Sequence, residues 1–146
     1  MPLADSNIWL ALALSKHQFH GAARTWLAER GPQEALLCRS TQQSFLRLLT
    51  TRAVLAPYGI PPLSNQAAWS VYDSLLADER IVWVAEPSGL EASWRKLAGG
   101  SKASPKLWMD AYLAAFAMAG GHQLVTTDKG FKQFKGLDLL VLSSKA

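Results

Sequence analysis

The chain has 146 residues, 49% of them hydrophobic, so it is long enough to bury a core and too apolar to be disordered. Its 15 lysine and arginine residues exceed its 11 aspartate and glutamate residues, which permits a polyanionic partner without demonstrating one. Cys38 is the only cysteine, which excludes an intramolecular disulfide and favours the reducing cytoplasm. The longest apolar run, "IWLALAL", is too short to cross a bilayer, and no signal peptide is expected. We expect a single domain over residues 1–146.

Short apolar segments rich in β-branched or aromatic residues alternate with amphipathic helical segments along the chain. In chain order, the expected strands span residues 2–4, 34–38, 80–87, 123–127 and 137–142. The expected helices span residues 6–15, 19–30, 41–54, 65–79, 88–99 and 106–120, and a short turn or helix spans 128–134. The expected helix starts are Asp5 or Ser6, Ser40 or Thr41, Ser64, and Ser104 with Pro105. This alternation predicts a three-layer α/β/α sandwich around a mostly parallel sheet.

Three aspartates stand at positions where this architecture builds sites. Asp5 directly follows the first expected strand and Asp128 directly follows the fourth, and ligands in such folds bind at the carboxyl ends of strands. Asp110 is the only acid in the apolar helix 106–120, where a carboxylate needs a cation, a hydrogen-bond network or a raised pKa. Three carboxylates in one pocket would suit a hard cation such as Mg²⁺ or Mn²⁺, which can position water at a phosphodiester.

Each of these residues also has an ordinary structural explanation. Asp5 could serve only as a helix N-cap, and Asp128 could be only a turn residue before Lys-Gly. Asp110 could instead pair with a basic residue such as Arg47. Most of the six tryptophans fall within apolar helix or strand patterns, which predicts packing rather than base stacking. That pattern does not decide the role of Trp108, which adjoins the "GSKASPK" loop.

Five segments, taken in order, carry a resemblance to a known family: "LADSNIWLALAL", "TQQSFLRLLT", "EPSGLEASWRKLAG", "SPKLWMDAYLAAFA" and "LVTTDKGF". The chain resembles the PIN-domain ribonucleases, specifically the VapC-type toxins of bacterial toxin–antitoxin pairs. The resemblance implies a five-stranded, mostly parallel sheet of order 3-2-1-4-5 and an endoribonuclease that depends on Mg²⁺ or Mn²⁺. It also implies an RNA substrate, a homodimer in the cytoplasm, and a cognate VapB-type antitoxin that blocks the active site.

The resemblance also assigns roles to individual residues. Asp5, Asp110 and Asp128 match the family's metal-site acids, and a water activated by the metal would attack the RNA phosphate. The expected supporting residues are Asn7, Gln42, Thr126 and Thr127, and the candidate phosphate contacts are Arg47, Lys102, Lys106 and Lys129. Many family members carry a Glu in the helix after the second strand, where this chain has Gln42 or Ser44. A neutral side chain there should weaken metal affinity.

Two other functions fit the sequence pattern. A degenerate PIN domain could act as a binding module, with Gln42 marking the loss of catalysis. A flavodoxin-like phosphoacceptor domain would also collect acids at strand ends. Such domains typically show an acidic pair at the first strand and an acceptor Asp after the third. Here the first strand offers one acid, and the third ends in "VAEP".

Overall fold

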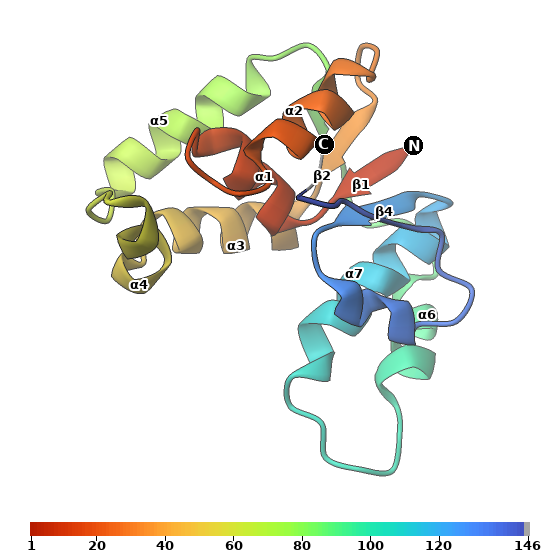
Figure 1. Cartoon of the computed structure of the whole chain (residues 1–146). Coiled ribbons are helices and arrows are strands. Elements are labelled where there is room, and N and C mark those ends of the chain that lie inside the picture. The colour runs from red at the N-terminus through yellow and green to blue at the C-terminus, as the bar shows by residue number, and fades with distance from the viewer. Residues whose placement is uncertain (145–146) are drawn as a thin grey trace.

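A computed structural model describes residues 1–144 of the chain, and its five short strands form one sheet (Figure 1). The strands are β1 (Pro2–Ala4), β2 (Ala35–Leu37), β3 (Ile81–Trp83), β4 (Gln123–Thr126) and β5 (Leu139–Val141). They pair in parallel in the order β3-β2-β1-β4-β5, which confirms the predicted strand order. A flavodoxin-like domain has the order 2-1-3-4-5, so the phosphoacceptor alternative is wrong.

Helices cover both faces of this sheet. The helical elements are α1 (Ser6–Ala13), α2 (His20–Ala28), α3 (Arg39–Leu49), α4 (Arg52–Leu55), η1 (Ala56–Tyr58), α5 (Asn65–Leu76), α6 (Leu90–Ala98), α7 (Leu107–Gly120) and η2 (Lys129–Gln133). Figure 1 shows α1, α2, α3 and α5 gathered on one side of the strands, and α6 and α7 on the other. The predicted three-layer sandwich is therefore confirmed. No helix within residues 1–144 is long and apolar enough to cross a membrane.

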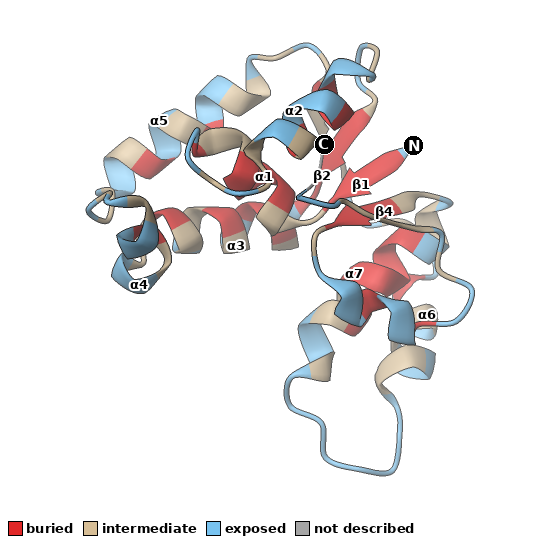
Figure 2. Ribbon diagram, in the orientation of Figure 1, coloured by how far each residue is buried: buried red, intermediate tan, exposed pale blue. Residues whose placement is uncertain are grey.

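The central strands are apolar on both faces, as a sheet covered on both sides requires. Leu3 and Leu124 point into the core beneath α6 and α7, whereas Ala4 and Val125 point into the core beneath α1 and α3. Figure 2 shows the resulting band of buried residues through β1, β2, β4 and the inner half of α7. This packing fixes the carboxyl ends of β1 and β4 next to each other, because Ala4 is in register with Val125.

The start of α3 differs from the prediction. Neither Ser40 nor Thr41 caps this helix, because it begins at Arg39 and its N-cap is Cys38. The Thr41 hydroxyl instead accepts a hydrogen bond from the Cys38 backbone N–H at 3.0 Å and so closes the turn from inside the helix. The end of α3 was also predicted too late. The Thr51 hydroxyl donates to the Arg47 carbonyl at 2.6 Å, and the helix breaks before α4 begins.

The start of α7 also lies later than predicted. Ser104 and Pro105 form a turn before the helix, in which the Leu107 N–H donates to the Ser104 carbonyl at 3.0 Å. As a result Asp110 belongs to the first helical turn instead of the buried interior. A carboxylate near a helix N-terminus is favoured by the helix dipole, so Asp110 occupies a less costly position than the sequence suggested.

Candidate active site

Asp5 is held at the carboxyl end of β1 by both neighbouring elements. Its backbone N–H donates to the Val125 carbonyl of β4 at 2.9 Å, and one carboxylate oxygen accepts from the Ser6 N–H at 2.7 Å. Asp5 is therefore the N-cap of α1, as predicted. The second oxygen, Oδ2, accepts from the Thr126 hydroxyl at 2.9 Å and from the Asn7 amide at 3.2 Å. A capping role uses only the first oxygen, so capping alone does not account for the second set of contacts.

The Thr126 hydroxyl is the centre of a polar network at the ends of β1 and β4. It lies fully buried, donates to Asp5, and accepts from the Asp128 backbone N–H at 3.0 Å and the Asn7 amide at 3.2 Å. The Asn7 carbonyl oxygen in turn accepts from the Thr127 N–H at 3.2 Å. Three of the four predicted supporting residues, Asn7, Thr126 and Thr127, are thus brought together by hydrogen bonds with two of the predicted acids.

Asp128 leaves the end of β4 and caps the short helix η2. Its Oδ1 accepts from the Gly130 N–H at 2.8 Å, and the side chain is otherwise exposed. A side chain on Gly130 would press against this oxygen, because an added Cβ would lie 3.0 Å from it. Asp128 is therefore a turn residue, as the ordinary explanation expects. It also belongs to the group of acids, since its charge acts on Asp110.

Asp110 approaches the same edge of the sheet from α7, and its pKa is raised. Partial burial is the main cause of this rise, and the negative charge of Asp128 adds to it. Burial likewise raises the pKa of Asp5, to which the charge of Asp110 contributes, although the hydrogen bonds from Thr126 and Ser6 oppose the rise. The three carboxylates therefore interact electrostatically, which indicates that they converge on one region.

No cation offsets these charges in the part of the chain that the structure describes. Its ion pairs join Arg30 to Glu29, Arg80 to Asp78 and Arg95 to Glu91. The alternative in which Asp110 pairs with Arg47 is therefore absent from residues 1–144. Within those residues, no group of three or more His, Cys, Asp or Glu side chains could by itself hold a metal ion. The charges of the aspartates act on one another, but their side chains do not form a complete metal-binding site within the described residues.

Gln42, the fourth predicted supporting residue, has a different partner. Its side chain is 5% exposed, and its carbonyl oxygen accepts from the Arg39 guanidinium at 2.6 Å. The same guanidinium lies over the Trp83 ring, 4.8 Å from its centroid. No hydrogen bond within the described residues joins Gln42 to the three aspartates, so the structure does not bring it together with them as a ligand. Ser44, at the other position where the family has a Glu, is partly buried.

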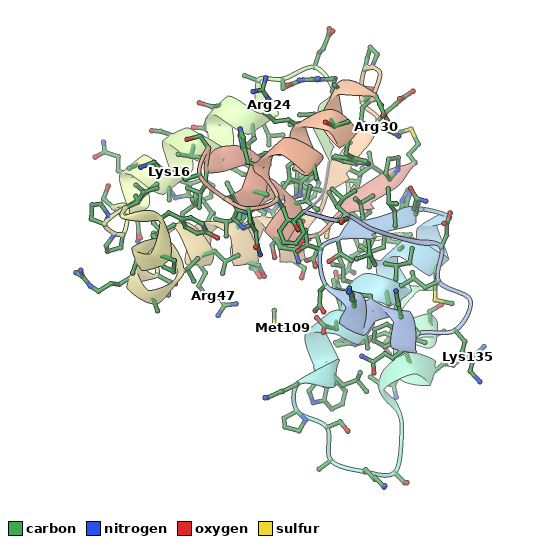
Figure 3. All side chains as sticks on the ribbon, viewed as in Figure 1. Lys16, Arg24, Arg30, Arg47, Met109 and Lys135 are labelled. Carbon is green, nitrogen blue, oxygen red and sulfur yellow. The ribbon has the colours of Figure 1, made fainter. Side chains whose placement is uncertain are left out.

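The four predicted phosphate contacts lie on different elements. All four are exposed: Arg47 on α3, Lys102 before α7, Lys106 as the N-cap of α7, and Lys129 as the first residue of η2. Lys106 lines the same pocket of about 470 Å³ as Asp110, and Lys129 directly follows Asp128 in the chain. Figure 3 shows Arg47 reaching from α3 toward the space that Met109 enters from α7.

The sequence reasoning missed Arg39, which is the first residue of α3 and is separated from the end of β2 only by Cys38, at the same edge of the sheet as Asp5. Its place after the strand "EALLC" was a signal that could have found it, because the strand-end rule that selected Asp5 applies equally to a base. The rule was applied only to acids. Arg39 lines a pocket together with Trp108 and Glu86, a combination of elements that no local pattern in the sequence indicates.

The sequence and the fold of the chain match those of known proteins. The PIN domain family model matches residues 3–137. Ribonuclease VapC41 of Mycobacterium tuberculosis is 56% identical over 145 residues, covering 98% of this chain and 99% of that protein. Two solved structures share the fold. The sarcin-ricin loop cleaving toxin VapC20 of Mycobacterium tuberculosis has a TM-score of 0.63 and 19% identity, covering 98% of this chain and 100% of that one. A toxin–antitoxin complex from Klebsiella pneumoniae has a TM-score of 0.59 and 17% identity, covering 97% of each chain. The chain belongs to the PIN-domain family and, within it, to the VapC ribonucleases.

Proposed function

We propose that this chain is an endoribonuclease toxin that hydrolyses RNA phosphodiester bonds with the help of Mg²⁺ or Mn²⁺. The observation that carries the proposal is that Asp5 and the Asp128 backbone share the Thr126 hydroxyl at the ends of β1 and β4. The charge of Asp110 acts on Asp5 and that of Asp128 acts on Asp110, and no ion pair within the described residues involves these acids. Mutual repulsion of this kind is relieved by a bound cation. The 56% identity with a ribonuclease over nearly the full chain supports the reaction class.

The donor set fits a hard cation, since it consists of carboxylate and hydroxyl oxygens. It contains too few free carboxylate oxygens for a dry cage, because both oxygens of Asp5 already accept hydrogen bonds. Mg²⁺ keeps several of its waters and needs only one or two direct carboxylates. Asp110 and Asp128 would thus hold the cation together with waters, and Asp5 would hold it through one of those waters.

The chain's own residues position these groups. The Thr126 hydroxyl orients both the Asp5 carboxylate and the Asp128 backbone. The Asn7 side chain forms hydrogen bonds with Asp5 after β1 and with Thr127 after β4. When bound, the cation supplies a water of lowered pKa and offsets charge on the phosphate. Asp5 and Asp110 must lose their protons to serve as ligands, and a nearby cation lowers their raised pKa values. Lys106, beside Asp110, is placed to contact an RNA phosphate.

Cleavage of RNA by the purified chain tests this proposal. We expect cleavage with Mg²⁺, loss of cleavage in EDTA, and loss in Asp110→Asn while the far-UV circular dichroism spectrum is retained. The matched control is Asp73→Asn, which removes an exposed acid of α5 and should cleave like the wild type. Cleavage that persists both in EDTA and in Asp110→Asn would contradict the proposal.

One observation favours the second candidate function, a binding module without catalysis. Gln42 is neutral at a position where the family resemblance leads us to expect an acid, and its oxygen accepts a hydrogen bond from Arg39. Titration calorimetry with Mn²⁺ separates the two functions without an activity assay. We expect measurable Mn²⁺ binding that weakens in Asp110→Asn and is unchanged in Asp73→Asn. Failure to detect Mn²⁺ binding at millimolar metal would favour the binding module.

We further propose that the chain acts in the cytoplasm as a homodimer and is inhibited by a cognate VapB-type antitoxin. The solved complex from Klebsiella pneumoniae supports an antitoxin partner, and exposed apolar side chains mark partner sites. Trp69 on α5 is 49% exposed and suits such an interface. Sedimentation should show a dimer that Trp69→Glu weakens. A monomeric wild type would contradict the dimer.

A further inference from the structure

A pocket of about 400 Å³ opens between α3 and the first turns of α7, near the carboxyl edge of the sheet. We call it the Trp108 pocket. The lining residues that matter here are Arg39, Glu86, Trp94, Trp108, Met109 and Tyr112. Its walls come from α3, α6, α7 and the segment after β3, so four separate elements build it. Cavities lined by aromatic side chains with a few convergent polar groups are typical of ligand sites.

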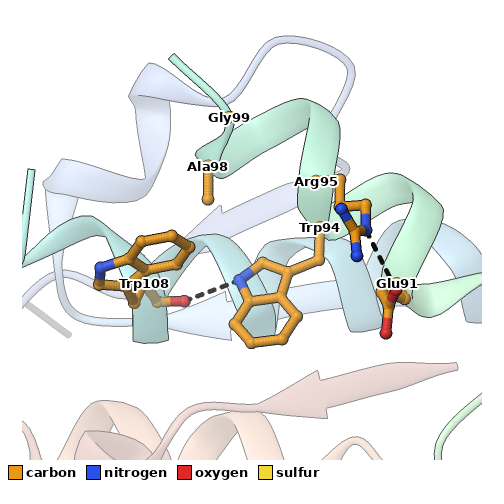
Figure 4. Close-up of a pocket in the computed structure, with 6 residues that line it drawn as sticks. All are labelled: Glu91, Trp94, Arg95, Ala98, Gly99 and Trp108. Carbon is orange, nitrogen blue, oxygen red and sulfur yellow. Dashed lines mark hydrogen bonds and ion pairs between the residues drawn. The ribbon is translucent and has the colours of Figure 1, made fainter. Parts of the chain in front are cut away.

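Three aromatic rings form one wall of the Trp108 pocket. Trp94 meets Trp108 edge to face at 6.3 Å and meets Tyr112 edge to face at 5.3 Å. The Trp94 indole N–H donates to the Trp108 backbone carbonyl at 3.0 Å, as Figure 4 shows for the tryptophan pair. Trp108 nevertheless remains 55% exposed. Packing in the core therefore does not account for a tryptophan at this position, and the exposed indole ring can stack with a planar ligand.

The polar groups of the pocket have fixed positions. The Tyr112 hydroxyl donates to Glu86 Oε1 at 2.6 Å, which orients that carboxylate. Burial and the charge of Glu86 raise the pKa of Tyr112, so the hydroxyl keeps its proton. Opposite, the Arg39 guanidinium is held by Trp83 and Gln42. The pocket thus combines a flat apolar wall with one carboxylate and one cation.

We propose that the Trp108 pocket binds one unpaired nucleobase of the RNA substrate, stacked on Trp108, with the exocyclic amino group of the base donating to Glu86. The inference rests on the proposed ribonuclease function and names how that substrate is held. Arg39 lines the Trp108 pocket and Lys106 lines the pocket that holds Asp110, so two cations are available to the phosphates that flank such a base. Aromatic rings with neighbouring cations are the recurring means of holding single-stranded RNA.

The position on α7 joins the pocket to the acids. Trp108 and Asp110 are two residues apart, which places them on nearly opposite faces of the helix, with Met109 between them. Met109 is 59% exposed and lines the Trp108 pocket, whereas Asp110 lines the neighbouring pocket with Lys106. In the proposed complex, the RNA strand runs from the base on Trp108 over Met109, so that an adjacent phosphate reaches Asp110.

Glu86 sets the preference among bases. A carboxylate accepts from the N4 amino group of cytosine. Uracil carries a carbonyl oxygen at the same position, which a carboxylate repels. Cytosine and uracil have the same size and stack on the same ring, so the carboxylate of Glu86 favours cytosine over uracil. We therefore expect oligocytidylate to bind more tightly than oligouridylate.

Fluorescence anisotropy of labelled RNA octamers tests the pocket apart from catalysis. Oligocytidylate and oligouridylate are titrated with the chain in EDTA, where the proposed cleavage does not occur. We expect Trp108→Ala to weaken oligocytidylate binding by about 5- to 100-fold and Trp108→Phe to retain most of the affinity. The hydrogen bond from Trp94 survives both changes, because it ends on a backbone carbonyl. Met118→Ala, an exposed residue ten positions further along α7, is the matched control and should bind like the wild type.

A second variant tests the choice of base. Glu86→Gln offers an amide donor to the uracil oxygen. The ratio of the affinities for oligocytidylate and oligouridylate should therefore fall by at least about 3-fold. An unchanged ratio would overturn the role of Glu86. If Trp108→Ala binds RNA as the wild type does, the stacking proposal is wrong, and a partner protein becomes the better occupant. Absence of cleavage by the wild type in Mg²⁺ would contradict the ribonuclease proposal. The RNA affinities measured in EDTA would still test the pocket, because they do not depend on cleavage.

Discussion

Two regions at the same edge of the sheet are built in opposite ways. At the ends of β1 and β4, polar residues close in sequence to a strand are locked by hydrogen bonds between 2.7 and 3.2 Å around a fully buried Thr126. In the Trp108 pocket, by contrast, side chains from four elements meet around an indole that is 55% exposed. The first region is set by backbone register, and the second by packing between helices.

The two regions should differ in how much stability the fold loses when one of their side chains is replaced. Loss of one group in the buried network leaves other buried donors without partners, which costs about 1–3 kcal/mol for each unsatisfied group. Loss of an exposed ring leaves only water in its place. Variants in the network should therefore alter both activity and stability, whereas variants in the Trp108 pocket should alter RNA binding and leave the fold intact.

Asp5→Asn should have the largest effect. We expect cleavage to fall by more than about 100-fold, because even residues that only support metal ligands typically contribute 10- to 100-fold. The amide can still accept from the Ser6 N–H, so α1 keeps its N-cap. Single-turnover cleavage assays in Mg²⁺ measure the loss, and wild-type-like cleavage would exclude Asp5 from the reaction.

The same variant should change how stability depends on pH. The pKa of Asp5 is raised in the folded state, so the folded chain binds more protons than the unfolded chain. The stability that protonation provides is present below the unfolded pKa and is lost as pH rises through the folded pKa. In EDTA, the melting temperature of the wild type relative to Asp5→Asn should therefore fall as the pH rises above about 4, the ordinary pKa of a free aspartate. A pH-independent difference would contradict the raised pKa.

Thr126→Val should have the next largest effect. The change keeps the shape of the side chain but removes the hydroxyl that donates to Asp5 and accepts from the Asp128 N–H. We expect an activity loss of about 10- to 100-fold and a stability loss of about 1–3 kcal/mol. Urea denaturation and cleavage assays measure the two losses. Thr126→Ser restores the hydroxyl and should recover most of both, so failure to recover would show that packing of the methyl group matters more.

Arg39→Gln should have a moderate effect, mainly on RNA binding. If Arg39 contacts a phosphate, its removal lowers the slope of log Kd against log salt by about 0.7. The affinity for an RNA octamer in EDTA should fall a few-fold at low salt, and the melting temperature should also fall because the buried Gln42 oxygen loses its donor. Anisotropy titrations at several salt concentrations measure the slope. An unchanged slope would remove Arg39 from the RNA contacts.

Gln42→Glu should have the smallest effect. The new carboxylate would face the Arg39 guanidinium, which already binds the Gln42 oxygen at 2.6 Å, and their pairing would neutralise the added charge. We expect Mn²⁺ affinity to change by less than about 3-fold, as measured by calorimetry. A large gain in affinity would show that residue 42 reaches the acids once it carries a charge.

The acids at strand ends were predictable because their positions depend on local patterns. A short apolar strand followed at once by a capping aspartate places Asp5, and the same pattern places Asp128. The surroundings of Asp110 were not predictable. Its helix begins at Leu107, one residue later than predicted, and Asp110 lies partly buried in the first turn instead of within the buried interior. The hydrogen bond between Arg39 and Gln42 was not predictable either, because the sequence does not fix the direction of the Arg39 side chain.

Local patterns in the sequence are sufficient to predict the parallel sheet and to place Asp5 and Asp128 at the ends of its strands. Alternating apolar segments specify parallel strands, and parallel strands bring their carboxyl ends to one edge. Only the tertiary structure decided that Trp108 stands open beside Glu86 and Arg39, and that no base within the described residues neutralises the aspartates. Such contacts join residues far apart in the chain, and they depend on how helices pack, which periodicity does not encode.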